Sequence, residues 1–303
     1  MSGAAGACPP SGTPATSLPW RDVRFRSPDG LELYARDYGP SESASTPVLC
    51  LSGLTRNSRD AQPLAEQIAS DRRVIAPDYR GRGRSAYAPD WSSYTVEVEL
   101  ADAIALLDRL GVGKVVLIGT SRGGLIAMLM AALHRDRLAG VLLNDIGPVL
   151  EPAGLLRIRQ YLGRPLRFTT WRGAVAALKR INPGLESLSE AEWLAFARRV
   201  YRDEGGRPVL DYDPNLRRSF PTPAKIAAGA VPPMWELMAP LEGLPVATLR
   251  GEHSDLLSPQ TLARMAENVP GLDAVTVANR GHAPFLDESE SRAGVARLLA
   301  RCA

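Results

Sequence analysis

The feature that most constrains the fold is a strand-like apolar run that leads into a Gly-x-Ser-x-Gly turn and then into a helical pattern. The turn spans residues 119–123, with Ser121 at its centre. A serine on so sharp a strand-to-helix turn takes a strained backbone conformation that exposes its hydroxyl group. The strand and the helix pass closely there, so positions 119 and 123 need glycine. The pattern alone also occurs by chance in glycine-rich turns, but its strand–turn–helix setting favours a nucleophilic Ser121.

Short β-rich runs alternate with helical patterns along the chain, which is typical of an α/β sheet. The central runs are apolar throughout, as strands buried on both faces are. The first two runs tend to alternate apolar and polar residues, and a Pro-Asp-Gly turn joins them. This pattern predicts a hairpin at the sheet edge. The clearest helical pattern covers residues 95–110. We expect a mostly parallel eight-stranded sheet flanked by helices. The expected strands are residues 23–27, 31–38, 48–52, 73–77, 115–120, 140–145, 246–251 and 274–278.

Between residues 146 and 240 the strand signals disappear, and helical patterns rich in arginine and tryptophan replace them. The alternation of strands and helices resumes at Leu244. An insertion between two halves of one sheet explains this better than a separate tandem domain. We therefore expect a core formed by residues 19–145 and 241–303, with a helical cap at 146–240. Residues 1–18 carry no charge and no long apolar run, which predicts a disordered leader.

A serine hydroxyl group is a weak nucleophile unless a base takes its proton, and the chain has three histidines. His134 ends the helix that follows Ser121, far from the turn by helical rise. His253 follows a strand end, yet its neighbour Asp255 is the better functional candidate there. His282 lies in the loop after the last strand, and such loops project toward the sheet edge where ligand sites collect. We predict that His282 is the base.

The base needs a carboxylate that holds the imidazole in the correct tautomer and stabilises its cation. Asp255 lies in the loop after the penultimate strand. It gives the order Ser, Asp, His along the chain, which accompanies this kind of serine turn. Glu252 competes from the same loop, and Asp145 competes from the end of an earlier strand. We predict Asp255 as the acid, with these two as the alternatives.

The negative charge that develops on an attacked carbonyl oxygen needs two backbone N–H donors. One comes from the residue after the nucleophile, Arg122, at the start of a helix. The other should come from the loop after the third strand, where Gly53 allows a tight turn and the Leu54 N–H can face the serine. We predict an oxyanion hole formed by the Leu54 and Arg122 N–H groups.

Taken together, these motifs resemble the α/β-hydrolase superfamily, in the bacterial serine hydrolase branch with a helical cap. The resemblance covers roughly residues 20–300 and implies the fold, a helical cap and a Ser-His-acid triad. That branch includes esterases, enol-lactonases, C–C bond hydrolases and cofactor-free haloperoxidases. The motifs that carry it are Ser52-Gly53-Leu54, the run Asp78–Ser85, the turn Gly119–Gly123, and Gly281–Phe285.

Two residues depart from the pattern of this family. Ser52 stands where the family usually has histidine, so the hydrogen bonds that anchor its loop must be built differently. Arg122 stands where methionine or glutamine is common. Its side chain either forms a structural salt bridge, which we favour, or places a charge beside the pocket that suits an anionic substrate.

The arginines at 80, 82 and 84 lie between glycines but lack the lysine and Ser/Thr of a phosphate-binding loop, so we predict a structural turn.

Lys and Arg outnumber Asp and Glu in the cap by 14 to 9 between Glu151 and Glu236, a balance compatible with an acidic substrate. Large apolar side chains of the cap either pack it onto the core or line a substrate pocket. The candidates for the pocket are Tyr161, Trp171, Trp193 and Trp235.

Composition excludes several classes of function. A formal net charge of +3 is too small to indicate a nucleic-acid or anionic-membrane partner. No stretch approaches the roughly 20 apolar residues that span a bilayer. The three cysteines are odd in number and scattered, which predicts no disulfide framework and no metal site and suits a reducing, cytoplasmic location.

The predicted function is a serine hydrolase that needs no cofactor and acts on a small-molecule substrate. The favoured substrate is a small or medium carboxylic ester, thioester or lactone, cleaved through an acyl-enzyme. The alternatives are a C–C bond hydrolase of aromatic degradation, which uses the same triad, and a non-catalytic ligand receptor on the same fold. The sequence leaves the oligomeric state open.

Overall fold

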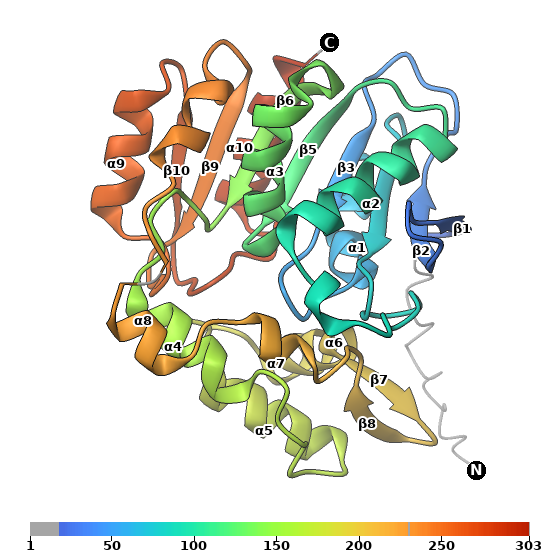
Figure 1. Cartoon of the computed structure of the whole chain (residues 1–303), viewed down its shortest axis with the longest axis vertical. Helices are drawn as coiled ribbons and strands as arrows, with labels where there is room; N and C mark the ends of the chain where they lie inside the picture. Colours follow the sequence, from blue (N-terminus) through green and yellow to red (C-terminus); the bar gives the residue numbers. More distant parts are fainter. Residues whose placement is uncertain (1–17, 230, 303) are drawn as a thin grey trace, which may run out of the picture.

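A computed structural model of the chain describes residues 18–229 and 231–302. The expected leader, residues 1–18, lies outside the described residues except for Leu18. An eight-stranded sheet forms the centre, in the order β1-β2-β4-β3-β5-β6-β9-β10 (Figure 1). β1 and β2 are antiparallel, β2 is antiparallel to β4, and the remaining pairs are parallel. The expected mostly parallel sheet is confirmed. Its strands are β1 (Trp20–Arg26), β2 (Glu32–Tyr38), β3 (Val48–Leu51), β4 (Val74–Asp78), β5 (Val115–Thr120), β6 (Leu138–Asn144), β9 (Val246–Gly251) and β10 (Asp273–Val277).

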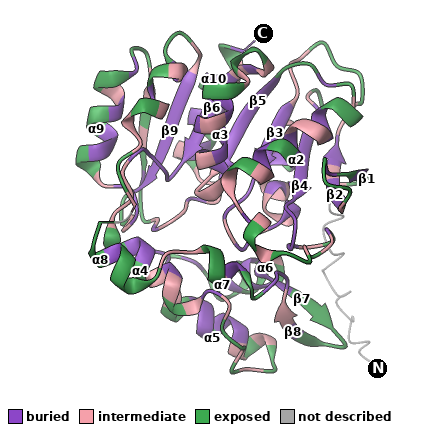
Figure 2. Ribbon diagram, in the orientation of Figure 1, coloured by how far each residue is buried: buried purple, intermediate pink, exposed green. Residues whose placement is uncertain are grey.

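Helices cover both faces of the sheet, and each face has its own apolar cluster. Alternate residues of β5 separate the clusters: Val115 and Leu117 pack on one side, Val116 and Ile118 on the other. α2 (Val96–Arg109), α3 (Arg122–Leu133) and α9 (Pro259–Asn268) pack on the first face; α1 (Gln62–Ile68) and α10 (Ser289–Ala300) pack on the second. Figure 2 shows the central strands buried and the outer sides of the helices exposed. This double coverage explains why the central strands are apolar throughout.

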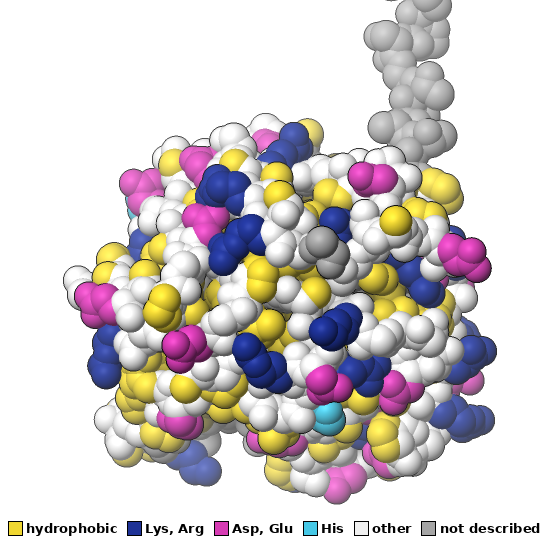
Figure 3. Space-filling model, turned by 90° about the horizontal axis from the view of Figure 1, so that it is seen from above, with side chains coloured by type: hydrophobic (Ala, Val, Ile, Leu, Met, Phe, Trp, Pro, Cys, Tyr) yellow, Lys and Arg dark blue, Asp and Glu magenta, His cyan; other side chains and the backbone are white. Residues whose placement is uncertain are grey.

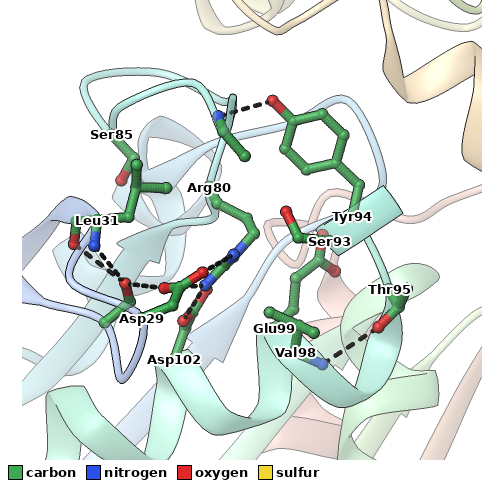
Figure 4. Close-up of polar contacts among 12 residues, drawn as sticks. Asp29, Leu31, Arg80, Ser85, Ser93, Tyr94, Thr95, Val98, Glu99 and Asp102 are labelled. Carbon is green, nitrogen blue, oxygen red and sulfur yellow. Dashed lines mark hydrogen bonds and ion pairs between the residues drawn. The ribbon is translucent and has the colours of Figure 1, made fainter. Parts of the chain in front are cut away.

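α2 is the helix expected at residues 95–110. Thr95 caps its first turn by accepting a hydrogen bond from the Val98 N–H at 3.3 Å (Figure 4). Such caps satisfy one of the N–H groups that a helix start leaves free. After the helix, Gly111 takes a φ of 65°, a left-handed conformation that glycine adopts without strain.

The loop after β4 is the structural turn that its arginines predicted. The buried Arg80 guanidinium donates to Asp102 and Asp29 at 2.7 to 3.0 Å (Figure 4). Arg84 pairs with Asp22 at 2.7 Å. These charges are neutralised within the chain, so the loop has no cluster of free cations for a phosphate.

The segment between β6 and β9 begins with three helices, α4 (Pro152–Tyr161), α5 (Trp171–Ile181) and α6 (Glu190–Val200). A hairpin of β7 (Tyr201–Glu204) and β8 (Arg207–Leu210) follows, and it corrects the expectation that this segment holds no strands. Its turn is Gly205-Gly206, both with positive φ, a dipeptide that signals hairpins. These elements gather at one end of the sheet (Figure 1). α5 and α6 share an apolar cluster separate from the two that cover the sheet.

The last part of this segment returns to the sheet layer. After the short helices α7 (Leu216–Ser219) and α8 (Pro223–Ala227) come two 3₁₀ turns, Trp235–Leu237 and Ala239–Leu241, which pack against α3. Met238 and Leu241 are buried in the apolar cluster of that face. We therefore propose that the cap ends before Met234 rather than at residue 240.

The surface seen from above Figure 1, at the end of the sheet away from the cap helices, mixes basic and acidic side chains (Figure 3). No helix among the described residues is long and apolar enough to cross a membrane.

Candidate active site

Ser121 lies on the turn between β5 and α3 with φ 53° and ψ −111°, a conformation that residues other than glycine rarely adopt. The tight passage of strand and helix imposes this turn. A Cβ atom on Gly119 would collide with the backbone of Gly123, and a Cβ atom on Gly123 would collide with the backbone of Leu51. Both glycines are therefore required by close backbone packing, as the sequence pattern predicted.

Ser121, His282 and Asp145 form one hydrogen-bonded chain. His282 Nε2 lies 2.9 Å from Ser121 Oγ, and His282 Nδ1 lies 2.7 Å from Asp145 Oδ2. Asp145 is fully buried, whereas the His282 side chain is 9% exposed. One ring nitrogen thus faces the hydroxyl group, and the other faces a carboxylate that fixes the tautomer. His134 and His253 do not contact Ser121; His253 lies at the surface beside Glu252.

The prediction that Asp255 holds the His282 ring is wrong. Asp255 instead forms a two-pronged ion pair with Arg157 of α4, with nitrogen–oxygen distances of 2.6 and 2.7 Å. Burial alone would raise the pKa of Asp255, but the hydrogen bonds and charge of Arg157 outweigh burial and lower it. Its backbone C=O also accepts the Gly154 N–H at 2.9 Å. Asp255 therefore joins the loop after β9 to the cap, and the other alternative, Glu252, is half-exposed.

The register of two neighbouring strands explains why Asp145 reaches the ring. Thr120 at the end of β5 pairs with Asn144 at the end of β6, so Ser121 and Asp145 leave the sheet side by side. The Ser121 N–H donates to the Asn144 C=O at 3.0 Å. Asp145 also accepts the Gly251 N–H at 2.8 Å. The polar pair Asn-Asp after an apolar strand was the sequence signal for this acid.

Two further polar side chains, which sequence reasoning missed, hold the triad. Ser254 donates its hydroxyl proton to Asp145 Oδ2 at 2.6 Å. Asn144 donates from its amide nitrogen to the Pro284 C=O at 2.9 Å and to Thr120 Oγ1 at 3.0 Å. The Ser254 contact orients the carboxylate of Asp145. The two Asn144 contacts join the loop of His282 to the end of β5. Both residues directly adjoin the acid candidates in sequence.

The residues predicted to form the oxyanion hole are connected through one buried carboxylate. Glu99 of α2 pairs with Arg122 at 2.7 Å and with Arg82 at 2.7 Å. Arg82 in turn donates to the Leu54 C=O at 2.9 Å. Burial raises the pKa of Glu99, but the charges of Arg122 and Arg82 outweigh burial and lower it. The Arg122 side chain is therefore a structural salt-bridge partner, as favoured above.

The loop that carries Leu54 is anchored without the family's histidine. The Ser52 C=O accepts the Gly123 N–H at 3.1 Å and the Tyr79 hydroxyl group at 3.1 Å. The Ser52 hydroxyl group is buried without a hydrogen-bond partner in the described chain. The backbone of the loop, rather than a side chain at position 52, thus fixes its distance from the serine turn.

A cavity of about 660 Å³ opens beside Ser121 and His282. It runs between the serine turn and the cap and is mostly apolar, with Tyr161 in its wall. The prediction that three tryptophans line the pocket is wrong for this cavity. Trp193 is buried in the cap cluster, whereas Trp171 and Trp235 are half-buried and stack under Arg198 and Arg264. Trp193 and Trp171 pack in the cap cluster, and Trp235 packs against the apolar cluster of one sheet face, which is the usual fate of large apolar side chains.

The described residues hold no group of three or more His, Cys, Asp or Glu side chains arranged to bind a metal ion. Cys50 and Cys302 are buried thiols. The site itself places a hydroxyl group, an imidazole and a carboxylate in line, next to a cavity of substrate size.

Comparisons with known proteins show the family to which the chain belongs. The model of the alpha/beta hydrolase family matches residues 48–298. The 3-hydroxybutyrate-oligomer hydrolase of Cupriavidus necator is 37% identical over 275 residues, which cover 88% of this chain and 93% of the relative. The 2-(acetamidomethylene)succinate hydrolase of Mesorhizobium japonicum is 29% identical, covering 80% and 83%. The crystal structure of an alpha/beta hydrolase from Novosphingobium aromaticivorans superimposes with a TM-score of 0.86 at 43% identity, covering 93% of this chain and 98% of that one. The chain belongs to the alpha/beta hydrolase family.

Proposed function

We propose that the chain is a serine hydrolase that cleaves carboxylic esters through an acyl-enzyme. The observation that carries this is the contact of His282 Nε2 with Ser121 Oγ at 2.9 Å, with Asp145 on the other ring nitrogen at 2.7 Å. This order of atoms lets the imidazole take the serine proton while the carboxylate balances the cation. The alternative of a non-catalytic receptor gives no reason for a base and an acid in line.

The proposed reaction has two steps. Ser121 Oγ bonds to the substrate carbonyl carbon as its proton passes to His282 Nε2; the ester C–O bond then breaks and the leaving alkoxide takes that proton. A water molecule next gives a proton to His282, attacks the acyl carbon and releases the acid, and the proton returns to Ser121. The Leu54 and Arg122 N–H groups would hold the oxyanion in both steps.

A short ester of a hydroxy acid is the substrate class that we favour. The relative from Cupriavidus necator, similar over nearly its whole length, is named for oligomers of 3-hydroxybutyrate, which are such esters. The cavity supports this choice, because its apolar wall and volume of about 660 Å³ suit a short aliphatic chain. Thioesters and lactones would share the same mechanism.

Labelling with a fluorophosphonate, followed by an ester panel, tests the proposal. We expect the probe to modify Ser121, identified by peptide mass spectrometry, and pretreatment to abolish hydrolysis of the 3-hydroxybutyrate dimer and of short acyl esters. Absence of labelling would contradict the serine mechanism. Labelling without turnover of any ester or lactone would instead favour the C–C bond hydrolase alternative, which uses the same nucleophile.

A further inference from the structure

The cavity beside Ser121 carries a surplus of positive charge. Its wall contains six arginines but, among the described residues, one carboxylate, Asp60. Three of these arginines, Arg164, Arg167 and Arg180, are exposed, and water screens their charge. The side chains of Arg199 and Arg56 are only 19% and 16% exposed. The lining arginines are Arg56, Arg164, Arg167, Arg180, Arg199 and Arg217.

Asp60 neutralises Arg199 only in part, because its carboxylate is already hydrogen-bonded to Arg56. Arg56 Nε donates to Asp60 Oδ2 at 2.7 Å, and its Nη2 donates to Oδ1 in a second, shorter contact. Arg199 Nε lies 3.9 Å from Asp60 Oδ1, beyond hydrogen-bonding distance. Two guanidinium groups thus share one carboxylate, and the Arg199 side chain has no hydrogen-bond acceptor among the described residues.

The surroundings of Arg199 are mostly apolar. Its guanidinium lies over the ring of Phe285 at 5.3 Å and the ring of Phe196 at 6.0 Å. Burial lowers the pKa of Arg199; the charge of Asp60 opposes this shift, and the charge of Arg56 adds a smaller lowering. Asp287 and Glu66 also attract Arg199, but among the described residues neither carboxylate forms an ion pair with it. The cation therefore has no hydrogen-bonded counter-charge in the part of the chain that the structure describes.

Both arginines line the cavity that contains Ser121, and Arg56 also passes beside the serine turn. A Cβ atom on Gly53 would lie 3.3 Å from Arg56 Cγ and 3.9 Å from Ser121 Cβ, so the Arg56 stem passes beside the serine turn. Phe285, under Arg199, follows His282 by three residues. The backbone of Arg199 is also fixed, because its C=O accepts from Arg59 at 3.0 Å.

We propose that Arg199, with Arg56 beside it, binds a carboxylate of the substrate, so that the site selects esters that carry a free acid group. The inference rests on the proposed function and narrows it from esters in general to acid-bearing esters, such as an oligoester of a hydroxy acid with its terminal carboxylate free. A planar guanidinium pairs with a carboxylate through two parallel hydrogen bonds, and Arg199 has these donors available. The carboxylate would supply the negative charge that Asp60 does not.

Binding to the Ser121→Ala protein tests this without turnover. The ligands are the linear dimer of 3-hydroxybutyrate and its methyl ester, which differ in the charge of the terminal carboxylate. By titration calorimetry we expect the acid to bind at least tenfold more tightly than the methyl ester. Adding Arg199→Gln should weaken binding of the acid about 10- to 100-fold, the usual effect of losing a charge-assisted pair, and change binding of the methyl ester less than about threefold.

Arg180→Gln is the matched control, since it removes the same charge from an exposed part of the same cavity wall. We expect it to weaken acid binding less than about threefold, because an exposed charge is screened. Arg199→Lys should retain part of the preference for the acid. The proposal is overturned if the parent protein does not prefer the acid, if Arg199→Gln weakens both ligands alike, or if Arg180→Gln has the same effect as Arg199→Gln.

Hydrolysis of 4-nitrophenyl acetate, a neutral ester, separates this inference from the proposed function. With Ser121 intact, the parent protein should hydrolyse this ester, and Arg199→Gln should lower kcat/KM for the dimer of 3-hydroxybutyrate relative to its methyl ester at least tenfold. Ester hydrolysis by the parent protein together with this loss of selectivity supports the inference. Ester hydrolysis with no difference between acid and methyl ester rejects the inference and leaves the proposed function intact.

Discussion

Replacing Ser121 with alanine is expected to lower the turnover of a short ester by about 10⁶-fold, because removing an activated nucleophile typically costs that much. The fold should remain intact, since the Ser121 hydroxyl group contacts only His282 Nε2 among the described side chains. Turnover at saturating substrate and thermal unfolding by circular dichroism measure the two effects.

Ser52→Ala provides the matched control for this variant. Its hydroxyl group is buried near the same turn and has no hydrogen-bond partner in the described chain, so its loss should leave turnover within about threefold. An alanine at position 121 that retains a tenth of the parent activity would show that Ser121 is not the nucleophile.

Replacing Asp145 with asparagine is expected to lower turnover about 10⁴-fold, the cost when a triad loses the carboxylate that fixes the tautomer of its histidine. Asp145 is fully buried and receives hydrogen bonds from His282, Ser254 and the Gly251 N–H. An amide in its place donates where the carboxylate accepts, so His282 would present the wrong ring nitrogen to Ser121. Single-turnover kinetics would show the loss in the chemical step.

Asp255→Asn is the second test of the proposal that Asp145, rather than Asp255, is the acid of the triad. Asp255 is bound to Arg157 of the cap, so we expect this variant to lower turnover less than about tenfold and to act mainly through stability. Thermal unfolding of both variants separates the two effects. If Asp255→Asn were the severe variant and Asp145→Asn the mild one, the third member of the proposed triad would be wrong.

Most of the fold was predictable because its signals are local. The eight strands of the sheet appear within a few residues of their expected positions, since an apolar run between turns needs no distant contact to be identified. The hairpin of β7 and β8 was missed because its strands are only four residues long and pair only with each other. Its Gly205-Gly206 turn is the local signal for this hairpin in the sequence.

The substrate pocket could be predicted far less well than the nucleophile. Aromatic residues were reasonable candidates from composition, but whether a ring lines a cavity or packs a cluster depends on which elements meet it. Trp193 packs into the cap cluster, whereas Phe285, which follows the His282 loop, lines the cavity. The partial neutralisation of Arg199 likewise arises from residues more than 100 positions apart in the chain, Asp60 and Arg199.

The sequence by itself predicted the sheet, the serine turn and the position of the histidine. Each of these features depends on one continuous stretch of residues, whose backbone geometry follows from its local composition. Only the tertiary structure decided between Asp145 and Asp255, since both lie in loops at the same sheet edge and both give the same order along the chain. The register of β5 against β6 brings Asp145 beside Ser121, and a charge from the cap, Arg157, binds Asp255 instead. Pairing of strands and packing of the cap are long-range interactions, which no local pattern specifies.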